Sequence, residues 1–513
     1  MAASMYPDYP PALTPEQQEH LVTSLKDWSI AHGLAVRPSP AFATDHTGVL
    51  ATTAPVTLFP SPFPRRCFEE ALAIQTAYNE LYSAIARDEP WLKGIVEELV
   101  EVDDFIAKLW DIHLAVKKEG YAQDLSLGLF RSDYMIHFDP AAPDSKPEIK
   151  QVEFNTIASS FGGLSARVSA LHKYLYGGPA HCLPSGINQN SFPPNSSLSS
   201  LAAGLAAAAT AYGSPKSGSS RLAVLFLVQD VERNVFDQRL LEYELESKHG
   251  VCVYRLPFPR ILTDTTLDPQ TRALLYHPPQ ASSITVEITA VYFRAGYAPS
   301  EYTHPDAWLA RHHLERSAAI KCPSVLTHLA GSKKIQQVLA TPNSLHISSF
   351  LRDHAAAQRV QNTFTNIYPL DDSEAGLKAQ ELALDPESAK RYVLKPQREG
   401  GGNNTYRTAI PPFLRDKVPR EKWKGYILME LINPPPLSNS ILRNGKIETG
   451  GIICELGVFG VCLWRNPTGE DRRGEVLKNS EAGYLLRTKG RESEEGGVAA
   501  GFGSMDSVVL VDV

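Results

Sequence analysis

Clustered cysteines are missing from this 513-residue chain. A zinc site or a disulfide framework needs closely spaced cysteines, and here neither a C-x-x-C pair nor a histidine-rich neighbour occurs. The sequence therefore predicts neither kind of site, and a reducing compartment fits it. The scattered cysteines are Cys67, Cys182, Cys252, Cys322, Cys454 and Cys462.

Long apolar runs and an excess of positive charge are missing as well. No segment approaches the roughly 18 apolar residues of a membrane span, and the first seven residues lack the basic and apolar regions of a leader. We therefore expect a cytoplasmic protein without a membrane partner. The formal net charge is −7, so the chain has no basic footprint for nucleic acid, and local charges must attract any anionic ligand.

The two common phosphate-binding loops are absent, since neither G-x-x-x-x-G-K-[ST] nor a G-x-G-x-x-G between a strand and a helix occurs. A different glycine-rich stretch, Lys395–Asn404, follows an apolar strand expected at residues 392–394. Its three consecutive glycines let backbone N–H groups approach phosphate oxygens, while Lys395 adds a positive charge and Glu399 a hard oxygen ligand for Mg²⁺. A solvated turn with incidental charges is the alternative for this stretch alone.

Two strands expected at residues 125–129 and 149–154 each end in polar residues. Glu153 and Asn155 point to one face of the second strand, because side chains alternate along a strand. A carboxylate and an amide oxygen on one face can converge on a hard cation. A half-exposed polar strand face is the alternative that the spacing leaves open.

A loop containing Ser159 and Ser160 precedes a helix expected at residues 166–176. Its hydroxyls are placed to contact an anionic substrate near the helix N-terminus, although an ordinary N-capping serine is the simpler alternative. Residues 177–220 are rich in Pro, Ser, Gly, Ala and Asn. They indicate a surface excursion or linker, apart from a helix expected at residues 201–212.

Residues 221–330 have the pattern of a small α/β domain without a dinucleotide fingerprint. An apolar run at 222–228 predicts a buried parallel strand, followed by a helix at 236–248 and strands at 251–254 and 290–293. Ligands bind at the ends of such strands, where this sequence has polar residues. These are Glu232, Asn234, Gln238, Arg294 and Tyr297.

Two later segments are also candidates for nucleotide binding. Lys333 and Lys334 open a helical segment, where the helix dipole disfavours cations unless an anion lies nearby. A solvated lysine pair is the alternative.

The apolar strand at 426–432 offers either an adenine slot with backbone hydrogen-bonding groups or plain core. Near the C-terminus, a small-residue loop at 496–501 is typical of a lid.

Together these stretches resemble the eukaryotic glutathione synthetases of the ATP-grasp superfamily, from about Thr14 to Val513. The glycine-rich stretch Lys395–Asn404 and four shorter motifs carry the resemblance. These motifs are Ser132-Asp133-Tyr134, Glu153-Phe154-Asn155-Thr156, Glu232-Arg233-Asn234-Val235-Phe236-Asp237-Gln238 and Leu486-Arg487-Thr488-Lys489.

The resemblance implies an α/β ATP-grasp fold with an inserted small parallel α/β substrate-binding domain, a helical N-terminal scaffold and a homodimeric assembly. Three parts follow from it. Residues 1–220 would form the N-terminal helical and strand part, with a Pro/Ser-rich excursion at 177–220. Residues 221–330 would form the substrate-binding domain, and residues 331–513 the nucleotide-binding part with the glycine-rich loop and the lid.

The resemblance also implies site residues, with ATP as co-substrate and Lys333 favoured over Lys334 without excluding the latter. The implied Mg²⁺ ligands are Glu153, Asn155 and Glu399, and the implied catalytic residues are Arg131, Lys395 and Arg487. The implied ATP-binding residues are Glu153, Lys333, Lys395, Glu399, Gly400, Gly401, Gly402, Asn403, Asn404, Tyr406, Met429, Glu430, Leu431, Ile432, Glu455, Lys489 and Glu495. The implied substrate-binding residues are Arg131, Ser159, Ser160, Glu232, Asn234, Gln238, Arg294, Tyr297, Arg487, Val498 and Ala499.

The implied reaction joins γ-glutamylcysteine and glycine into glutathione, with ATP giving ADP and phosphate. ATP activates the carboxylate as an acyl phosphate, so catalysis consists of positioning and charge stabilisation. This agrees with the absence of a convincing Ser-His-Asp or Cys-His arrangement. Two rivals are a ligase for another amine, such as β-alanine or serine, and a non-catalytic nucleotide-binding module.

Overall fold

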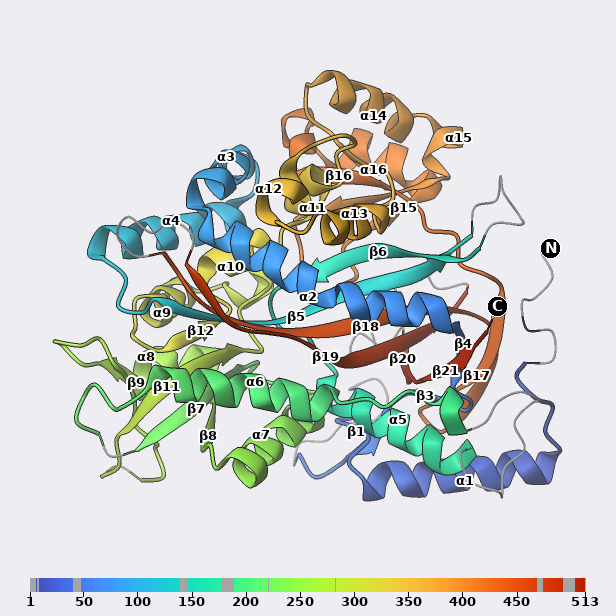
Figure 1. The fold of residues 1–513 in the computed structure, drawn as a ribbon, viewed down its shortest axis with the longest axis horizontal. Helices are drawn as coiled ribbons and strands as arrows, with labels where there is room; N and C mark the ends of the chain where they lie inside the picture. Colours follow the sequence, from blue (N-terminus) through green and yellow to red (C-terminus); the bar gives the residue numbers. More distant parts are fainter. Residues whose placement is uncertain are drawn as a thin grey trace.

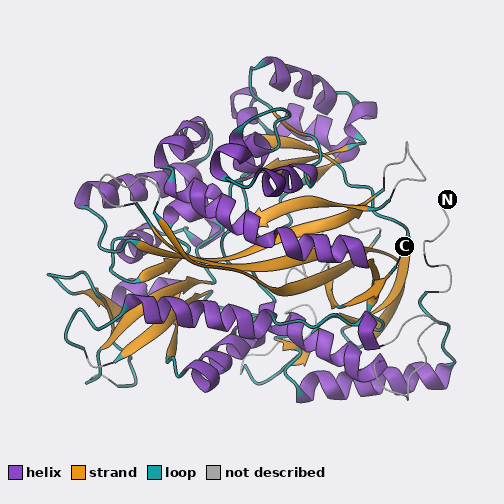
Figure 2. Cartoon of the chain, in the orientation of Figure 1, coloured by secondary structure: helices purple, strands orange, loops and turns teal. Residues whose placement is uncertain are grey.

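The computed structural model describes residue 6 and residues 9–39, 48–138, 146–176, 189–219, 221–281, 283–467, 474–491 and 503–512. A long mixed sheet crosses the molecule, with helices on both faces, and a smaller sheet lies above it among further helices (Figures 1 and 2). The mixed α/β class predicted from the sequence is confirmed. No helix in the described ranges is long and apolar enough to cross a membrane.

The antiparallel half of the large sheet is built on two long strands, β18 (Lys446–Arg465) and β5 (Leu125–His137). They pair from Leu456 opposite Tyr134 to Arg465 opposite Leu125. The predicted strand at 149–154 is β6, which pairs with β5 and places Asn155 opposite Arg131. The remaining strands of this half are β3 (Val56–Thr57), β6 (Glu148–Asn155), β17 (Leu437–Arg443), β19 (Glu475–Gly490) and β20 (Gly503–Asp506).

The parallel half of the same sheet contains the predicted α/β segment. The expected strand at 222–228 is β7, which runs parallel to β8 and β11, and the expected helix is α7 (Val235–His249). This half joins β5 through β12, where Lys321 lies opposite Ser126. One sheet therefore continues across the boundaries of the three parts expected from the sequence. The division into three domains stays a prediction. The parallel strands are β7 (Leu222–Val228), β8 (Val253–Pro257), β11 (Val286–Phe293) and β12 (Ile320–Cys322). Beyond β11, β10 (Leu274–Tyr276) and β9 (Thr265–Leu267) extend the sheet as antiparallel strands.

Alternation along β18 separates two hydrophobic cores. Cys462 and Trp464 pack into the core on the side of helix α2, whereas Val461 and Leu463 pack into the core on the side of α5 and α6. Successive strand side chains point to opposite faces, so one strand serves both cores. The helices on these faces are α2 (Arg65–Arg87), α5 (Gly162–Tyr176) and α6 (Ser197–Tyr212) (Figure 1).

The N-terminal helices agree with the periodicity of the sequence. Helix α1 (Pro15–Ala31) begins with the Thr14–Gln17 capping box, in which each side chain accepts a hydrogen bond from the other residue's backbone N–H. The helical stretch that follows is divided into three helices by short breaks. After α2 these are α3 (Glu89–Val100) and α4 (Asp104–Glu119).

The smaller sheet shows the same alternation. Leu394 and Leu428 face a core formed with helices α14 (Glu374–Leu384) and α16 (Ile410–Lys417), whereas Val393 and Met429 face away from that core. Helix α11 (Lys333–Leu339) lies on the side of Val393 and Met429. The strands of this sheet, in spatial order, are β13 (Ile367–Pro369), β16 (Tyr426–Glu430), β14 (Tyr392–Pro396) and β15 (Thr405–Tyr406).

Candidate active site

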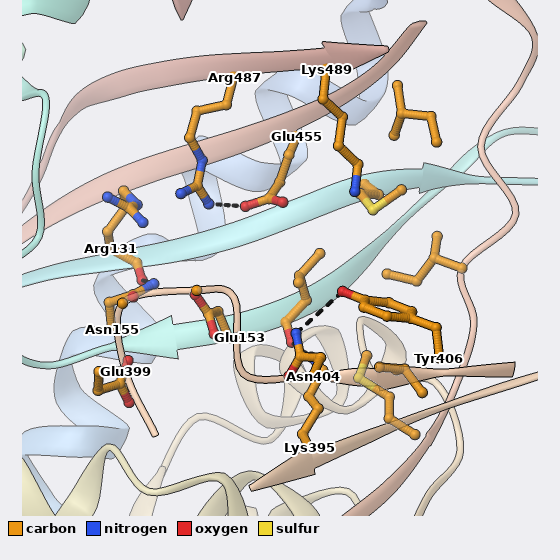
Figure 3. A pocket seen from close by; sticks show the side chains of 18 of the residues that line it. Arg131, Glu153, Asn155, Lys395, Glu399, Asn404, Tyr406, Glu455, Arg487 and Lys489 are labelled. Atoms are coloured by element: carbon orange, nitrogen blue, oxygen red, sulfur yellow. Dashed lines mark hydrogen bonds and ion pairs between the residues drawn. The ribbon is translucent and has the colours of Figure 1, made fainter. Parts of the chain in front are cut away.

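A cavity of about 310 Å³ lies between the large sheet and the smaller sheet. Strands β5, β6, β18 and β19 supply side chains to it from one side, and β14, β15, β16 and the glycine-rich loop from the other (Figure 3). Segments more than 300 residues apart in the sequence therefore meet at one place. The predicted site residues that line the cavity are Arg131, Glu153, Asn155, Ser159, Ser160, Tyr297, Lys395, Glu399, Gly400, Gly401, Asn404, Tyr406, Met429, Glu430, Leu431, Ile432, Glu455, Arg487 and Lys489.

Some predicted site residues do not line this cavity. Glu495, Val498 and Ala499 lie outside the described residues, as does the predicted lid loop at 496–501. Among the residues that the structure describes, seven predicted site residues are not part of the lining. They are Lys333, Gly402, Asn403, Glu232, Asn234, Gln238 and Arg294.

The glycine-rich loop has a backbone that only glycine adopts without strain. Gly400, Gly401 and Gly402 have φ angles of +95°, +72° and +76°, all in the left-handed region. The side-chain amide of Asn403 donates to the carbonyl oxygen of Gly401 across 2.9 Å. Three consecutive residues of this kind leave the loop backbone open toward the cavity, as a phosphate cradle requires.

Lys333 lies between the two carboxylates predicted to hold the metal. Its Nζ is 3.0 Å from an Oε atom of Glu399 and 3.1 Å from one of Glu153. Lys334 points elsewhere, with its Nζ 3.3 Å from a carboxylate oxygen of Asp371. Of the two lysines that the sequence left open, the structure brings Lys333 to the predicted site.

The pKa values of this cluster show how its charges are shared. Burial raises the pKa of Glu399 to about 7, against the opposing effect of Lys333. Burial also disfavours the Glu153 carboxylate, but Lys333 and Lys395 outweigh it and lower the pKa of Glu153 to about 2. Burial lowers the pKa of Lys395 to about 8. The positive charge of Lys333 and the negative charges of Glu153 and Glu399 therefore stabilise one another inside the cluster.

Glu153, Asn155 and Glu399 fit a magnesium ion by the chemistry of their donors. Two carboxylates share one cationic group, the Lys333 ammonium, which shows that a positive charge is accommodated there. The amide nitrogen of Asn155 donates to the carboxylate of Asp133 across 2.9 Å, which turns its carbonyl oxygen to the opposite side. Two carboxylates and an amide oxygen are hard ligands of the kind that Mg²⁺ prefers.

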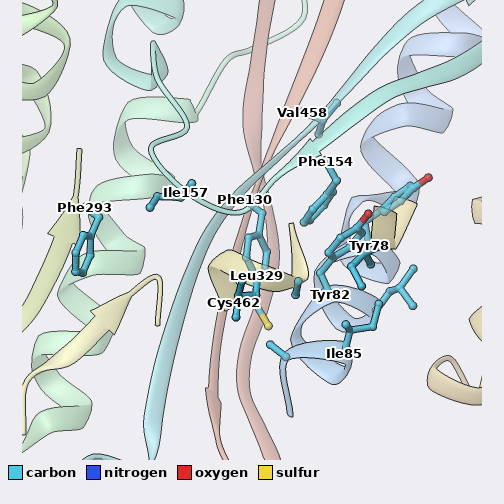
Figure 4. Close-up of a cluster of buried hydrophobic side chains, with 14 of the residues drawn as sticks. Tyr78, Tyr82, Ile85, Phe130, Phe154, Ile157, Phe293, Leu329, Val458 and Cys462 are labelled. Atoms are coloured by element: carbon cyan, nitrogen blue, oxygen red, sulfur yellow. The ribbon is translucent and has the colours of Figure 1, made fainter. Parts of the chain in front are cut away.

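The opposite face of β6 explains how these ligands are held. Phe154, between Glu153 and Asn155, points into the core, where its ring stacks on Tyr82 at 3.8 Å between centroids (Figure 4). Tyr78 and Phe130 pack against the same ring. The alternation of the strand therefore directs the two predicted ligands, Glu153 and Asn155, toward the cavity by burying the residue between them.

The apolar strand expected at 426–432 is β16, which ends at Glu430, and this segment contributes both to the core and to the cavity lining. Leu428 belongs to the core beneath the sheet, whereas Met429 and the following residues through Ile432 line the cavity. Asn404 donates a hydrogen bond of 3.2 Å to the hydroxyl of Tyr406 on β15, at the edge of the same sheet (Figure 3). An apolar surface edged by polar groups of this kind suits a nucleotide base.

Two arginines of the cavity lining, Arg131 and Arg487, are bound to a carboxylate that sequence reasoning missed. Asp133 receives hydrogen bonds from Arg131 Nε at 2.6 Å, from Arg131 Nη2 at 2.8 Å and from Arg487 Nη2 at 2.9 Å. Arg487 is also paired with Glu455. The signal was present in the sequence, because Asp133 stands two residues after Arg131 and so shares its strand face.

Buried donors in this region have no hydrogen-bond partner among the described residues. They include Nε and Nη1 of Arg294 and Nε of Arg487, while Nη2 of Arg294 donates to the hydroxyl of Ser160. The hydroxyl of Ser159, which lines the cavity, is also unpaired in the described structure. Buried donors of this kind match an anionic ligand that brings its own acceptors.

Helix α5 begins at Gly162, so the expected start at 166 is wrong. The reason is Asp237 of helix α7, whose carboxylate accepts hydrogen bonds from the backbone N–H groups of Phe161, Gly163 and Leu164 at 2.8–3.1 Å. A cap from another part of the chain leaves no local signal. These amides are therefore occupied, and the serine hydroxyls are the groups of this loop that face the cavity.

A hydrogen-bonded cluster outside the cavity lining contains Glu232, Asn234 and Gln238. Glu232 accepts hydrogen bonds from the Asn234 backbone at 2.8 Å and from the Gln238 side chain at 2.6 Å. Arg255 donates to the carbonyl oxygen of the Gln238 side chain at 2.7 Å. The structure thus brings the three predicted residues together, but none of them lines the cavity.

The fold and the cavity define an ATP-binding protein, and the comparisons with known proteins agree. The family model described as "Eukaryotic glutathione synthase, ATP binding domain" matches residues 15–510. The chain belongs to the eukaryotic glutathione synthase family.

Curated relatives match over nearly their whole length. The glutathione synthetase large chain of Schizosaccharomyces pombe is 40% identical, with 97% of this chain and 98% of the relative covered. The glutathione synthetase of Homo sapiens is 39% identical, with 96% and 97% covered. Among solved structures, a glutathione synthetase-like effector (GSS30) from Globodera pallida matches with a TM-score of 0.72 at 21% identity and 98% coverage of both chains, which supports the fold alone.

Proposed function

We propose that this protein is a glutathione synthetase, which joins γ-glutamylcysteine and glycine at the expense of ATP. One observation carries the proposal: a single cavity is lined by a glycine-rich loop with Lys395, Glu153 and Glu399, which we call the nucleotide end, and next to these by arginines, which we call the peptide end. The first end suits phosphates and the second suits the carboxylates of a small peptide. Full-length relatives named glutathione synthetase support the same substrates.

The reaction starts when a carboxylate oxygen of γ-glutamylcysteine attacks the γ-phosphorus of ATP. ADP leaves, and an acyl phosphate forms. The glycine amine then attacks the acyl carbon, phosphate leaves, and the amine loses a proton. No group of the protein is covalently modified, so the side chains act by positioning and by stabilising charge.

Each end of the cavity has its own part in this sequence. Lys395 and Lys333 neutralise phosphate charge, and the N–H groups of the glycine-rich loop follow the transferring phosphoryl group. Arg131, Arg294 and Arg487 hold the substrate carboxylates and steady the acyl phosphate. Mg²⁺, held by Glu153, Asn155 and Glu399, would supply further positive charge to the phosphates. The cation would also favour ionised Glu399, whose pKa is raised by burial.

The cellular setting and assembly belong to the same proposal. We infer a cytoplasmic homodimer. The unclustered cysteines fit a reducing compartment, and the homodimer is the assembly that the family resemblance implies. Size-exclusion chromatography with light scattering tests the assembly, and a monomer at micromolar concentration would contradict it.

ADP release by the purified protein is the experiment that tests the function. The assay contains Mg²⁺, ATP, γ-glutamylcysteine and glycine, and is repeated with each component omitted and with β-alanine or serine in place of glycine. We expect ADP release only when all four are present, with glutathione identified by mass spectrometry. ADP release that occurs with β-alanine or serine but not with glycine would indicate a ligase for another amine. Tight MgATP binding without ADP release would indicate a binding module.

A further inference from the structure

Asp133 is a fully buried carboxylate at the meeting point of three cavity residues. Its Oδ1 accepts from Arg131 Nε, and its Oδ2 accepts from Arg131 Nη2, Arg487 Nη2 and Asn155 Nδ2, all within 2.9 Å. The three donors come from β5, β6 and β19, so one carboxylate ties three strands together at the cavity. No role of the proposed mechanism uses it directly.

The neighbouring strand is adapted to this carboxylate. Gly457 of β18 lies opposite Asp133 in the sheet. A Cβ at Gly457 would lie 2.7 Å from Cδ of Arg131 and 2.8 Å from Oδ1 of Asp133, closer than side chains approach one another. A glycine inside a long strand marks a close approach of this kind. The room that it leaves is filled by the arginine–aspartate pair.

Asp133 also determines which way the Asn155 amide faces. Asn155 Nδ2 donates both to Asp133 at 2.9 Å and to the carbonyl oxygen of Arg131 at 3.2 Å. With two acceptors on its nitrogen side, the amide presents its oxygen in the opposite direction. A neutral or missing group at 133 would remove the charged acceptor and leave the amide free to turn.

We propose that Asp133 is a positioning residue that sets Arg131 and Arg487 for the peptide substrate and turns the Asn155 oxygen toward the metal. It acts through these three side chains and does not touch substrate. Its negative charge also keeps two like-charged guanidinium groups together in a buried place, where they would otherwise repel each other. This role rests on the proposed function of the cavity.

The variant Asp133→Asn keeps the size of the side chain but replaces a charged acceptor by an amide whose N–H groups face the arginine donors. Loss of a charge-assisted contact predicts that the KM and Kd for γ-glutamylcysteine rise by about 10- to 100-fold. The Mg²⁺ concentration for half-maximal activity should rise as well, because Asn155 is released. Isothermal titration with γ-glutamylcysteine alone measures the Kd without turnover.

A matched control separates positioning from general stability. Glu287 is another fully buried carboxylate, and it accepts hydrogen bonds from Tyr212 and from the backbone of Lys216 at 2.7 Å, away from the cavity lining. Glu287→Gln should lower the melting temperature but leave the KM for γ-glutamylcysteine unchanged. If Asp133→Asn is folded and binds γ-glutamylcysteine like the wild type, or shows only the changes of Glu287→Gln, the proposal is wrong.

A second variant covers the case in which Asp133→Asn does not fold. Gly457→Ala removes no polar group but pushes a Cβ against the Arg131–Asp133 pair. Gly450→Ala, on the same strand with nothing within 4 Å, is its control. We expect a raised KM for γ-glutamylcysteine in Gly457→Ala alone, and equal KM values would overturn the proposal. A wild-type protein that makes no glutathione would instead contradict the proposed function.

Discussion

The two ends of the cavity solve the problem of buried charge in different ways. At the nucleotide end, Lys333 pairs with Glu153 and Glu399, so the charges balance one another inside the protein. At the proposed peptide end, Arg487 in the lining and Arg294 beside the lining keep donors without a partner among the described residues. The comparison shows two situations. At the nucleotide end a ligand must displace the ion pairs of Lys333, whereas at the peptide end a ligand supplies the missing hydrogen-bond acceptors.

The largest effect is expected at the nucleotide end. Lys395→Met removes a buried positive charge that we propose faces the phosphates, and Glu399→Ala removes a proposed metal ligand, so each should lower kcat by about 10²- to 10³-fold or more while the fold is kept. Steady-state ADP release measures this. Lys334→Met is the control, since Lys334 pairs with Asp371 and does not line the cavity, and it should keep most turnover. Near-normal activity of Lys395→Met would refute the site.

A smaller and more selective effect is expected at the peptide end. Arg294→Met removes unpaired buried donors, so the KM for γ-glutamylcysteine should rise by about 10- to 100-fold, the value of one charge-assisted contact. The Kd for MgATP, measured by isothermal titration, should stay the same. A variant that weakens both ligands equally would show that the two ends are not separable.

The glycine-rich loop allows a matched comparison of strain. Gly402 and Gly445 both have a φ of +76°, and a Cβ at either would meet nothing within 4 Å. Alanine at each position should therefore cost about 1–2 kcal/mol of stability through backbone strain alone. Only Gly402→Ala should also lower kcat several-fold, because Gly445 lies in the turn between β17 and β18. Equal kcat values in the two variants would mean that the loop backbone takes no part in catalysis.

The smallest effect concerns a buried group that belongs to neither end. His172 is fully buried, and burial lowers its pKa to about 4, below the usual 6.5. Between these values the unfolded chain binds more protons, so the free energy of unfolding falls as the pH drops through 6.5. This contribution is about 1 kcal/mol between pH 7.5 and 5.5.

His172→Gln removes this titration and should show a flatter dependence of stability on pH in urea unfolding, although it is less stable at neutral pH. The KM values for both substrates should be unchanged. A slope as steep as that of the wild type would mean that His172 is not the group responsible.

The sequence predicted most of the fold and of the site because both leave local signals. Alternation and periodicity located β5, β6, β7 and the helices around them, and the motifs named most of the lining residues. Long-range contacts left no such signal. Asp237 caps helix α5 from a distance of more than 70 residues, and the pairing of β12 with β5 makes one sheet of two expected units. Asp133 was visible in a motif, but its role depends on side chains from two other strands.

The pairing of the first strands with the last ones has a consequence for how the chain is made. The side chain of Ser61 donates to that of Asp506 across 445 residues of sequence, and β20 runs beside β3. At about 5–20 residues per second, a ribosome needs about 20–90 seconds to synthesise that interval. Early strands must wait with open edges during this time, which is the state most exposed to aggregation. The large sheet therefore cannot be completed until the C-terminal strands have been synthesised.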